Sequence, residues 1–473
     1  MSKNELGTWN GCFIPCLLTI LGATLFLRLG FAVGMMGFAG ALGILLFAEW
    51  LSYTTVSSFS AICSNGNNGA GGAYFMISRT LGLPLGGASG FLFWVSYCLN
   101  AAYNCAAFTS VFQSTFFDET SWWRGGYWPT LIISSITMVP LGAIAFNGAG
   151  TFAQVNFVVF IGLAVGCIMT VYSLFFTSAH FTLQGYPGAT YSTFNLQTLE
   201  NNMYPDPVAS PQCGGLCGLS YCFAEVFPAV VGMMEGLNLI GDLKDPVHSI
   251  PLGTYAAVSC ALVVYAVFML GQAGTLNRIA LQFDLNVMQH ATIGDGAYVV
   301  LGVWTATLST VLGSLFGASR ILQAMARDTV FPGLTNFQYG TEIGDEPQPA
   351  VLMSYLIAQI FLFIGDLDAI APILTISFLL TYSLTDFSCF LLEKYHKEIF
   401  KPSFSFYSWQ TSLFNSVLII FVMFYLSVTQ AIVAIFIGLA ALWIATVNNR
   451  NKTVGMGEKA PLLKTADKLE AGN

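Results

Sequence analysis

Long apolar stretches separated by short polar segments run through almost the whole chain. The first covers residues 12–35, and a helix needs about 20 apolar residues to cross a hydrocarbon core of roughly 30 Å. The pattern therefore predicts an all-α polytopic membrane protein with twelve transmembrane helices. The predicted helices are residues 12–35, 38–63, 84–116, 127–147, 151–177, 216–241, 250–275, 294–324, 349–365, 368–392, 410–428 and 430–447.

The first and sixth predicted helices contain residues that interrupt a helix. Gly22 and Thr24 lie in the middle of the first, and Pro228, Gly232 and Gly236 lie in the sixth. Irregular backbone in a bilayer survives only where protein or a water-filled cavity receives its polar groups, and transporters hold ions at such breaks. Single glycines also serve close helix packing, but two breaks in matching positions favour broken helices 1 and 6.

This placement predicts two inverted five-helix repeats, because each repeat would begin with one of the broken helices. We expect a transmembrane domain over residues 1–447 and a short, disordered cytosolic tail over 448–473. Within the domain, the predicted parts are repeat one at 12–177, repeat two at 216–392 and helices 11 and 12 at 410–447.

Composition agrees with this class. Hydrophobic residues make up 55% of the 473 residues and charged residues 8%, with mean hydropathy +0.69, whereas soluble domains carry about 25% charged residues. Thirteen of the 16 Lys and Arg residues fall in segments that are cytosolic if the N-terminus is inside. The positive-inside rule then predicts two cytosolic termini. We expect a plasma-membrane protein with lipid around it, and no nucleic-acid partner.

No pattern of enzymatic residues emerges. The four histidines fall in predicted loops, and the glycine-rich run at 65–74 lacks the Lys-Ser/Thr of a phosphate loop. We therefore predict neither an enzyme nor a cofactor. Most of the eleven cysteines lie in predicted helices, but Cys213 and Cys217 end a long polar loop. These two form either a disulfide or a pair of free thiols.

Several segments together resemble the cation-chloride cotransporter family, solute carrier family 12, and most closely its divergent eighth-member branch. They are GTWNGCFIPCLLTILGATLFLRLGFAVG, NGNNGAGGAYFMISRTLGLPLGGASG, FPAVVGMMEGLNLIGDLKDPVHSIPLGT, SLFGASRILQAMARDTVFP and LDAIAPILTISFLLTYSL. The resemblance implies the amino acid-polyamine-organocation fold, which is LeuT-like, with sites where helices 1 and 6 unwind. Family members usually carry a large cytosolic C-terminal domain that dimerises. Its absence here leaves a homodimer, or association with related cotransporters, as an open expectation.

The resemblance also implies a sodium site formed by carbonyls of helix 1 and small hydroxyl residues of helix 8. Sodium is a hard cation that takes oxygen ligands of these kinds. The alternative is that the hydroxyls only bond a neighbouring helix. The implied sodium residues are Leu18, Leu21, Ala306, Ser309 and Thr310.

The family's potassium site looks damaged in this sequence. Thr19 stands in place of an asparagine, Val231 in place of a threonine and Asn104 in place of a tyrosine. Carbonyls near Ile20 and Pro228 would remain. The substrate-cation residues that we predict are therefore Thr19, Ile20, Asn104, Pro228 and Glu235.

Two chloride sites are implied at the N-terminal ends of half-helices, where free N–H groups and the helix dipole favour an anion. The upper site would use Gly22, Ala23 and Thr24. The lower site would use Gly232, Met233 and Met234 with Tyr382.

Carboxylates inside predicted helices depart from the family pattern. Glu225, Glu235, Glu49 and Asp386 face only Arg28 as an intramembrane cation, and such acids are either functional or hydrogen-bonded to a neighbouring helix. We expect a sodium-coupled secondary transporter that carries a cation with chloride. The alternatives are a carrier of organic cations, polyamines or amino acids that needs no chloride, and a non-transporting partner of a related cotransporter.

Overall fold

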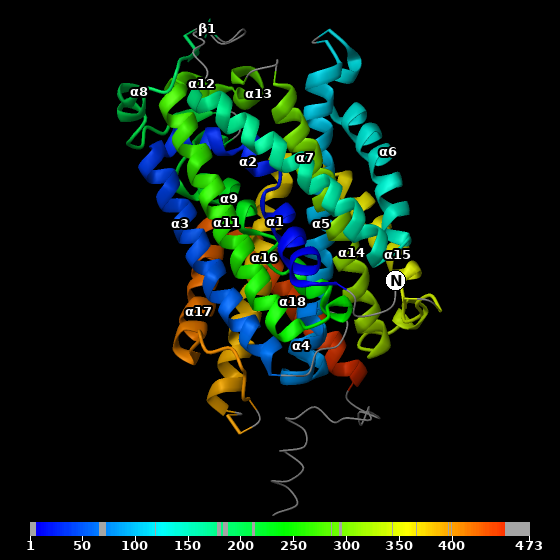
Figure 1. Ribbon diagram of the computed structural model, residues 1–473. Helices are drawn as coiled ribbons and strands as arrows, with labels where there is room; N and C mark the ends of the chain where they lie inside the picture. The colour runs from blue at the N-terminus through cyan, green and yellow to red at the C-terminus, as the bar shows by residue number, and fades with distance from the viewer. Residues whose placement is uncertain are drawn as a thin grey trace, which may run out of the picture.

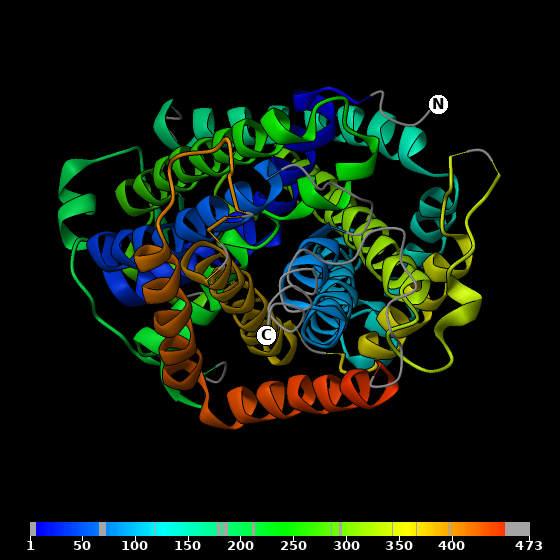
Figure 2. The same ribbon diagram turned by 90° about the horizontal axis from the view of Figure 1, so that it is seen from below.

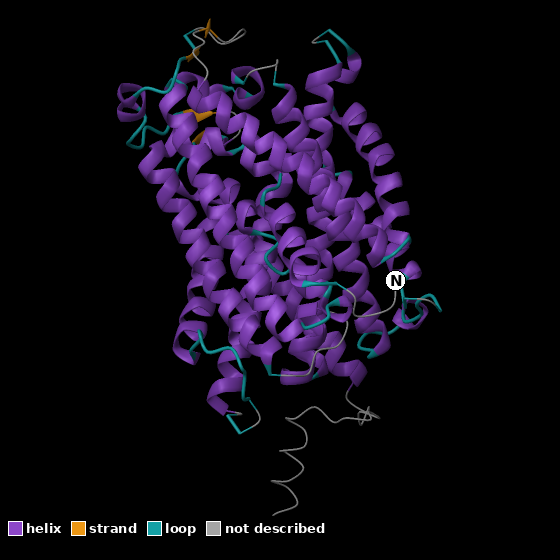
Figure 3. Cartoon of the chain, in the orientation of Figure 1, coloured by secondary structure: helices purple, strands orange, loops and turns teal. Residues whose placement is uncertain are grey.

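The computed structural model of the protein is a bundle of long helices joined by short loops (Figures 1 and 3). It describes residues 6–65, 72–118, 120–176, 181–182, 188–210, 213–284, 286–292, 296–342, 344–365, 367–395, 397–398 and 400–449. The predicted tail from Arg450 onward lies outside these residues. Each of the predicted apolar stretches contains helix, with boundaries shifted by a few residues.

The first half of the chain supplies the first five predicted spans. Gly37, with φ of 66°, turns the chain between the outer part of the first helix and the long second one. The elements are η1 (Trp9–Phe13), α1 (Ile14–Ile20), α2 (Ala23–Leu27), α3 (Leu29–Ser64), α4 (Gly72–Leu81), α5 (Leu83–Phe116), η2 (Trp122–Arg124), α6 (Tyr127–Phe146) and α7 (Ala149–Phe176).

The second half begins with a loop region and a second broken helix. The loop region holds β1 (Phe181–Thr182), β2 (Thr190–Tyr191), α8 (Leu196–Asn201), β3 (Ala209–Ser210) and β4 (Gly215–Leu216). The helices that follow are α9 (Leu219–Val226), η4 (Phe227–Val230), α10 (Glu235–Asn238), η5 (Ile240–Asp242), α11 (Pro246–Thr275), α12 (Arg278–Phe283), α13 (Val287–Ala291), α14 (Ala297–Arg327), η6 (Leu334–Phe337), α15 (Gln348–Leu362), α16 (Leu367–Tyr395), α17 (Trp409–Leu426) and α18 (Val428–Asn449).

Nine of the described helical stretches are long and apolar enough to cross a membrane. They begin at Trp9, Leu29, Tyr127, Ala149, Pro246, Ala297, Ile370, Trp409 and Val428. Many residues on their outer faces are large, apolar and exposed, such as Phe157, Ile168, Phe421 and Phe436. Such a surface is stable only in contact with lipid or another apolar partner. The protein is therefore a multi-span, all-helical membrane protein.

Helices in the centre of the bundle are buried and the last two lie at its edge. Seen from below, α5 runs close to the middle with α16 beside it, whereas α17 and α18 follow the periphery (Figure 2). Twenty-five residues of α5 are buried, so this helix forms much of the wall of any central site.

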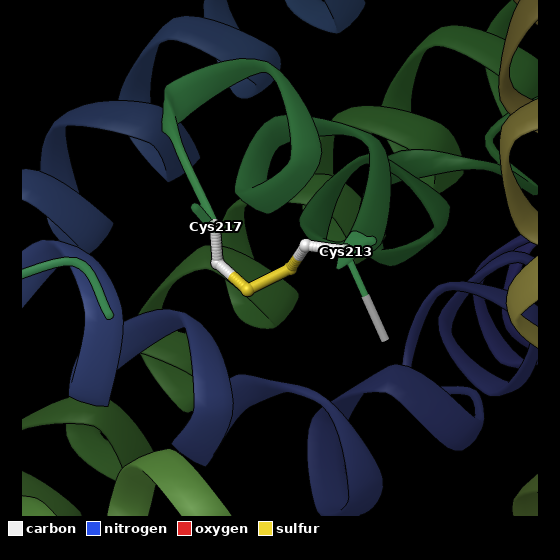
Figure 4. The surroundings of a disulfide bond; sticks show 2 residues. All are labelled: Cys213 and Cys217. Atoms are coloured by element: carbon white, nitrogen blue, oxygen red, sulfur yellow. A yellow bond between two sulfur atoms is a disulfide. The ribbon is translucent and has the colours of Figure 1, made fainter. Parts of the chain in front are cut away.

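The loop before the sixth span forms a cap at one end of the bundle. Two short antiparallel ribbons pair β1 with β2 and β3 with β4. Cys213 and Cys217 form a disulfide directly before α9 (Figure 4), which decides between the two alternatives left by the sequence. The disulfide fixes the start of the broken sixth helix to the cap.

Candidate functional site: two interrupted helices that touch

The first helix is interrupted at the predicted position. α1 ends at Ile20, Leu21 has φ −77° and ψ 47°, and Gly22 is extended before α2 begins at Ala23. A Cβ atom on Gly22 would lie 3.6 Å from Asn104 Oδ1 and 3.9 Å from Thr310 Oγ1. The break therefore places irregular backbone beside polar side chains of α5 and α14.

The sixth helix is interrupted over a longer stretch. The 3₁₀ turn η4 contains Pro228, Val231 is extended, and Gly232 has φ +108°. A Cβ atom on Gly232 would lie 2.7 Å from Thr19 Cβ and closer still to Thr19 Cγ2. Position 232 thus requires glycine for two reasons, because its φ is positive and because α1 leaves no room for a side chain. The two interrupted segments meet at Thr19 and Gly232.

Three of the five predicted sodium residues come together. The Thr310 hydroxyl lies 2.8 Å from the Ala306 carbonyl and 3.5 Å from the Leu18 carbonyl. Ser309 points elsewhere, because its hydroxyl donates to Asn156 Oδ1 of α7 at 2.8 Å. Leu21 lies at the break, and its amide is bound by the Leu17 carbonyl. The structure therefore joins α1 to α14 through Thr310 and α14 to α7 through Ser309.

The predicted cation residues surround the same break but already use several of their oxygens. Thr19 donates to the Pro15 carbonyl at 2.9 Å, and the Ile20 carbonyl accepts from Tyr265 Oη at 2.9 Å. The Pro228 carbonyl accepts from the Val231 amide at 3.3 Å. Asn104 donates to Asn100 Oδ1 at 3.0 Å, which leaves its own Oδ1 directed at Gly22.

Glu235 differs from these residues because one of its oxygens remains available. Its side chain is fully buried, and Oε2 accepts from Asn238 Nδ2 at 3.3 Å. Oε1 makes no hydrogen bond within the described chain. A Cβ atom on Gly313 would lie 2.9 Å from Glu235 Oε1 and 3.7 Å from Thr19 Oγ1. Glycine at 313 thus leaves space for the carboxylate beside the two breaks.

The predicted chloride residues lie at the two breaks. Gly22 is the N-terminal cap of α2 and makes no side-chain cap, so the first amides of α2 have no partner within the helix. Gly232, Met233 and Met234 precede α10, and the Tyr382 ring packs against Phe227 with ring centres 6.4 Å apart. The Tyr382 hydroxyl is buried without a hydrogen bond of normal geometry among the described residues. Both groups of amides therefore lie at buried helix starts beside the breaks.

The other intramembrane acids are separate from this centre. Asp386 accepts hydrogen bonds from Thr55 at 2.9 Å and from Asn415 at 2.7 Å, so it joins α16 to α3 and α17. Glu225 lies 3.3 Å from Arg28 Nε. Glu49 is 2% exposed, and neither of its carboxylate oxygens has a hydrogen bond in the described structure. Asp386 matches the alternative of a hydrogen-bonded acid.

One end of the bundle is closed below the breaks. Arg320 Nη2 lies 3.1 Å from Asp242 Oδ2 and 3.1 Å from Glu346 Oε2. Leu6 pairs with Leu243 through backbone hydrogen bonds, including Leu6 N to Asp242 O at 3.0 Å. The chain before η1 is thus held against the segment after α10.

A polar cavity of about 340 Å³ lies toward the opposite end. Arg28, Gln113, Arg124 and Asn286 are among its lining residues. Arg124 is held by the carbonyls of Ser114 and Phe117, the second at 2.8 Å. A polar cavity therefore lies at one end of the bundle and an ion-paired cluster at the other.

Sequence reasoning missed several residues of this site. Asn238 follows Glu235 by three positions, so helical spacing could have found it. Asn156 and Arg320 could not be found in this way, because their partners Ser309 and Asp242 lie 153 and 78 residues away.

Known proteins place this architecture in a family. The Amino acid permease family model matches residues 11–466. Solute carrier family 12 member 9 of Homo sapiens is 32% identical over 444 residues, which cover 90% of this chain and 48% of that protein. Member 8 of Mus musculus is 31% identical over 392 residues, covering 82% and 52%. An uncharacterized transporter of Schizosaccharomyces pombe is 30% identical over 445 residues, covering 92% and 41%.

The chain spans about half the length of the curated relatives that it matches. The match with the permease family nevertheless covers nearly all of the described helices, including both breaks. The matched family and these relatives are transporters and not enzymes. The chain therefore belongs to the amino acid permease family of membrane transporters, and its relatives there include members of solute carrier family 12.

Proposed function

We propose that this protein is a sodium-coupled secondary transporter that carries a cation together with chloride. The observation that supports this most is the contact between Thr19 and Gly232 at two helix breaks. The two interrupted segments are buried and in contact, and at such breaks in transporters carbonyls can bind cations and amides can bind anions. The relatives in solute carrier family 12 fit a transporter of this kind.

The finer architecture of the proposal has twelve membrane-spanning helices in two inverted repeats. To the nine long apolar stretches we add α5, the shorter apolar stretch Leu219–Val230 and α15. Each five-helix repeat would begin with one of the two broken helices. The charge bias of the loops supports cytosolic termini, and we place the protein in the plasma membrane as part of the proposal.

The proposed sodium site is centred on the Thr310 hydroxyl and the Leu18 carbonyl, which are 3.5 Å apart. Leu21 and Ala306 would supply further carbonyl oxygens. Ser309 would join them only after its hydroxyl leaves Asn156. Thr310 is therefore the side chain whose loss should change sodium dependence most.

The proposed substrate site lies between the breaks, with Glu235 as its charged group. A carboxylate and a chloride at roughly 4 to 6 Å repel each other by about 3 kcal/mol at an effective dielectric near 20. The two should therefore not be bound there together as anions. Either Glu235 is protonated when chloride enters, or its carboxylate takes the place of the anion.

A second candidate function follows from the same residue. If the Glu235 carboxylate replaces chloride, then an organic cation, a polyamine or an amino acid could be carried without chloride. The free Oε1 atom beside the breaks favours this candidate. The oxygens that Thr19, Ile20 and Pro228 already use argue against a dehydrated potassium ion as substrate.

Uptake into proteoliposomes tests the proposal. Purified protein would be supplied in turn with labelled rubidium, amines and amino acids, with sodium and chloride each removed. We expect saturable uptake of one solute that falls when sodium is removed, and no saturable rubidium uptake. Uptake that does not change when chloride is removed would support the second candidate function. No uptake of any of these solutes would contradict both candidate functions.

A further inference from the structure

A large groove lies away from the helix breaks, between α3, α11 and the segment 403–408. Its volume is about 990 Å³, which is within the range that encloses a drug-sized ligand. The wall segment is anchored, because the Lys401 amide donates to Asn65 Oδ1 at 2.7 Å and the Phe404 amide to Ser64 Oγ at 3.2 Å. The groove is therefore a formed feature and not a loose loop.

One wall of the groove is a row of three aromatic rings in contact with one another. The ring centres of Tyr53 and Tyr255 are 5.7 Å apart at 32°, and those of Tyr255 and Phe404 are 5.9 Å apart at 24°. The hydroxyls of this wall are fixed, because Tyr255 Oη lies 2.5 Å from Ser57 Oγ and Tyr53 Oη lies 2.6 Å from Ser259 Oγ. The three rings therefore form a largely apolar wall whose hydroxyl groups are held in place.

The groove opens onto an apolar surface. At its rim Trp50 is 43% exposed, Leu252 is 63% exposed and Phe406 is 79% exposed. In a protein that spans a membrane, such a rim faces lipid, with aromatic rings near the end of a span as in an interfacial belt. A ligand of this groove would therefore enter from the bilayer.

Charge limits the chemistry of that ligand. None of the described residues that line the groove is Lys, Arg, Asp or Glu. The lining His248 ring lies 2.8 Å from Asp245 Oδ2, and this hydrogen bond lowers the pKa of Asp245. Burial raises the pKa of Tyr407 to about 12, so this lining phenol stays neutral. The groove offers hydroxyls at its polar end, and no Lys or Arg among its described lining residues to bind a phosphate.

We propose that this groove binds one sterol molecule from the surrounding leaflet. The rigid ring system would lie on the Tyr53, Tyr255 and Phe404 wall, and its single hydroxyl would face Ser405, Ser408 and His248. A rigid, uncharged lipid loses less conformational freedom on binding than a flexible acyl chain. It also needs no counter-charge, which fits the lining better than a phospholipid headgroup does.

A photoreactive, alkyne-tagged cholesterol analogue tests this on the full chain in lipid nanodiscs. Thr54 lines the groove, and among the described residues its hydroxyl donates to the Trp50 carbonyl of its own helix at 3.0 Å. Thr54→Trp should fill the groove and lower labelling at least fivefold, and Leu252→Trp should do the same from the opposite side. Thr446→Trp is the matched control, because Thr446 is exposed on α18 and makes the same bond to its own helix, at 2.7 Å.

In wild type we expect labelled peptides within 50–57, 247–255 or 403–411, and competition by unlabelled cholesterol. Elution on size-exclusion chromatography would show which variants fold. If neither groove variant folds, peptide mapping with competition in wild type decides. Labelling spread over all lipid-facing helices, or equal in the three variants, would overturn the proposal. Stronger labelling of the same peptides by a photoreactive phospholipid would also overturn it.

Discussion

Arg28 Nε lies 3.3 Å from Glu225 Oε2, and the two side chains are 9% and 1% exposed. Arg28 joins α2 to α3, and Glu225 lies in the last turn of α9. The pair therefore connects the outer part of the first broken helix with the first part of the sixth. Arg28 also lines the polar cavity, together with Arg124.

Removing one partner of this pair should destabilise the protein, because the other charge stays buried. We expect Glu225→Gln to lower the free energy of unfolding by about 3 kcal/mol, measured by denaturant titration in detergent. Adding Arg28→Met should recover part of that loss. Glu200→Gln, on exposed α8, is the control. If the double variant lost as much unfolding free energy as Glu225→Gln and Arg28→Met lose together, the two residues would not be coupled.

Sodium dependence should distinguish two neighbouring hydroxyl residues. Thr310→Ala removes the hydroxyl nearest the Leu18 carbonyl, so we expect the half-saturating sodium concentration to rise about tenfold. Ser309→Ala should have a smaller effect, because Ser309 bonds Asn156. Sodium titration of uptake checks both. An unchanged sodium curve for Thr310→Ala would remove this residue from the sodium site.

The charge of Glu235 should control chloride dependence. Glu235→Gln keeps the size of the side chain and removes about 3 kcal/mol of repulsion from a nearby chloride. We expect a lower half-saturating chloride concentration or a new chloride requirement. If wild type must protonate Glu235 first, its chloride affinity should also fall as pH rises, and that of the variant should not.

Uptake over a chloride series at two pH values measures this effect. Glu49→Gln is the matched control, because Glu49 is also a buried acid, and neither of its carboxylate oxygens has a hydrogen bond in the described structure. Its chloride curve should equal that of wild type. Identical curves for wild type and Glu235→Gln at both pH values would exclude a role of this carboxylate in chloride binding.

The contact between Thr19 and Gly232 at the two breaks can be tested by a substitution that adds one methyl group. Gly232→Ala would place a Cβ atom against Thr19 in a backbone conformation that costs an L-residue about 1 to 2 kcal/mol. We expect uptake to fall at least tenfold. Gly333→Ala shares the positive φ but has open space around it, so it should transport normally. Thr19→Ser should partly rescue Gly232→Ala, and failure to do so would argue against the contact.

The breaks could be predicted from sequence because glycine and proline interrupt apolar runs directly. Side-chain direction could not be predicted in the same way. The sequence predicts both Ser309 and Thr310 as ligands of the sodium site, but the side chains of adjacent helix residues point about 100° apart. One of them therefore faces α7 and the other α1.

Long-range partners explain the rest of the difference between sequence and structure. Glu225 and Asp386 both lie in apolar stretches of the sequence. In the structure, Glu225 forms an ion pair with Arg28, whereas Asp386 accepts hydrogen bonds from Thr55 and Asn415. Their partners lie on helices whose neighbours depend on the packing of the whole bundle. The residue types predicted that these acids need partners, but not which ones.

The corner at Gly37 ties the cap before the sixth span to the start of the second span. A Cβ atom on Gly37 would lie 2.5 Å from the Tyr204 backbone, and the Phe38 and Ala39 amides donate to the carbonyls of Asn202 and Met203 at 2.8 and 3.1 Å. The cap cannot be lifted without opening these bonds. An antibody fragment that binds α8 would therefore restrain the turn at Gly37 as well as label the cap.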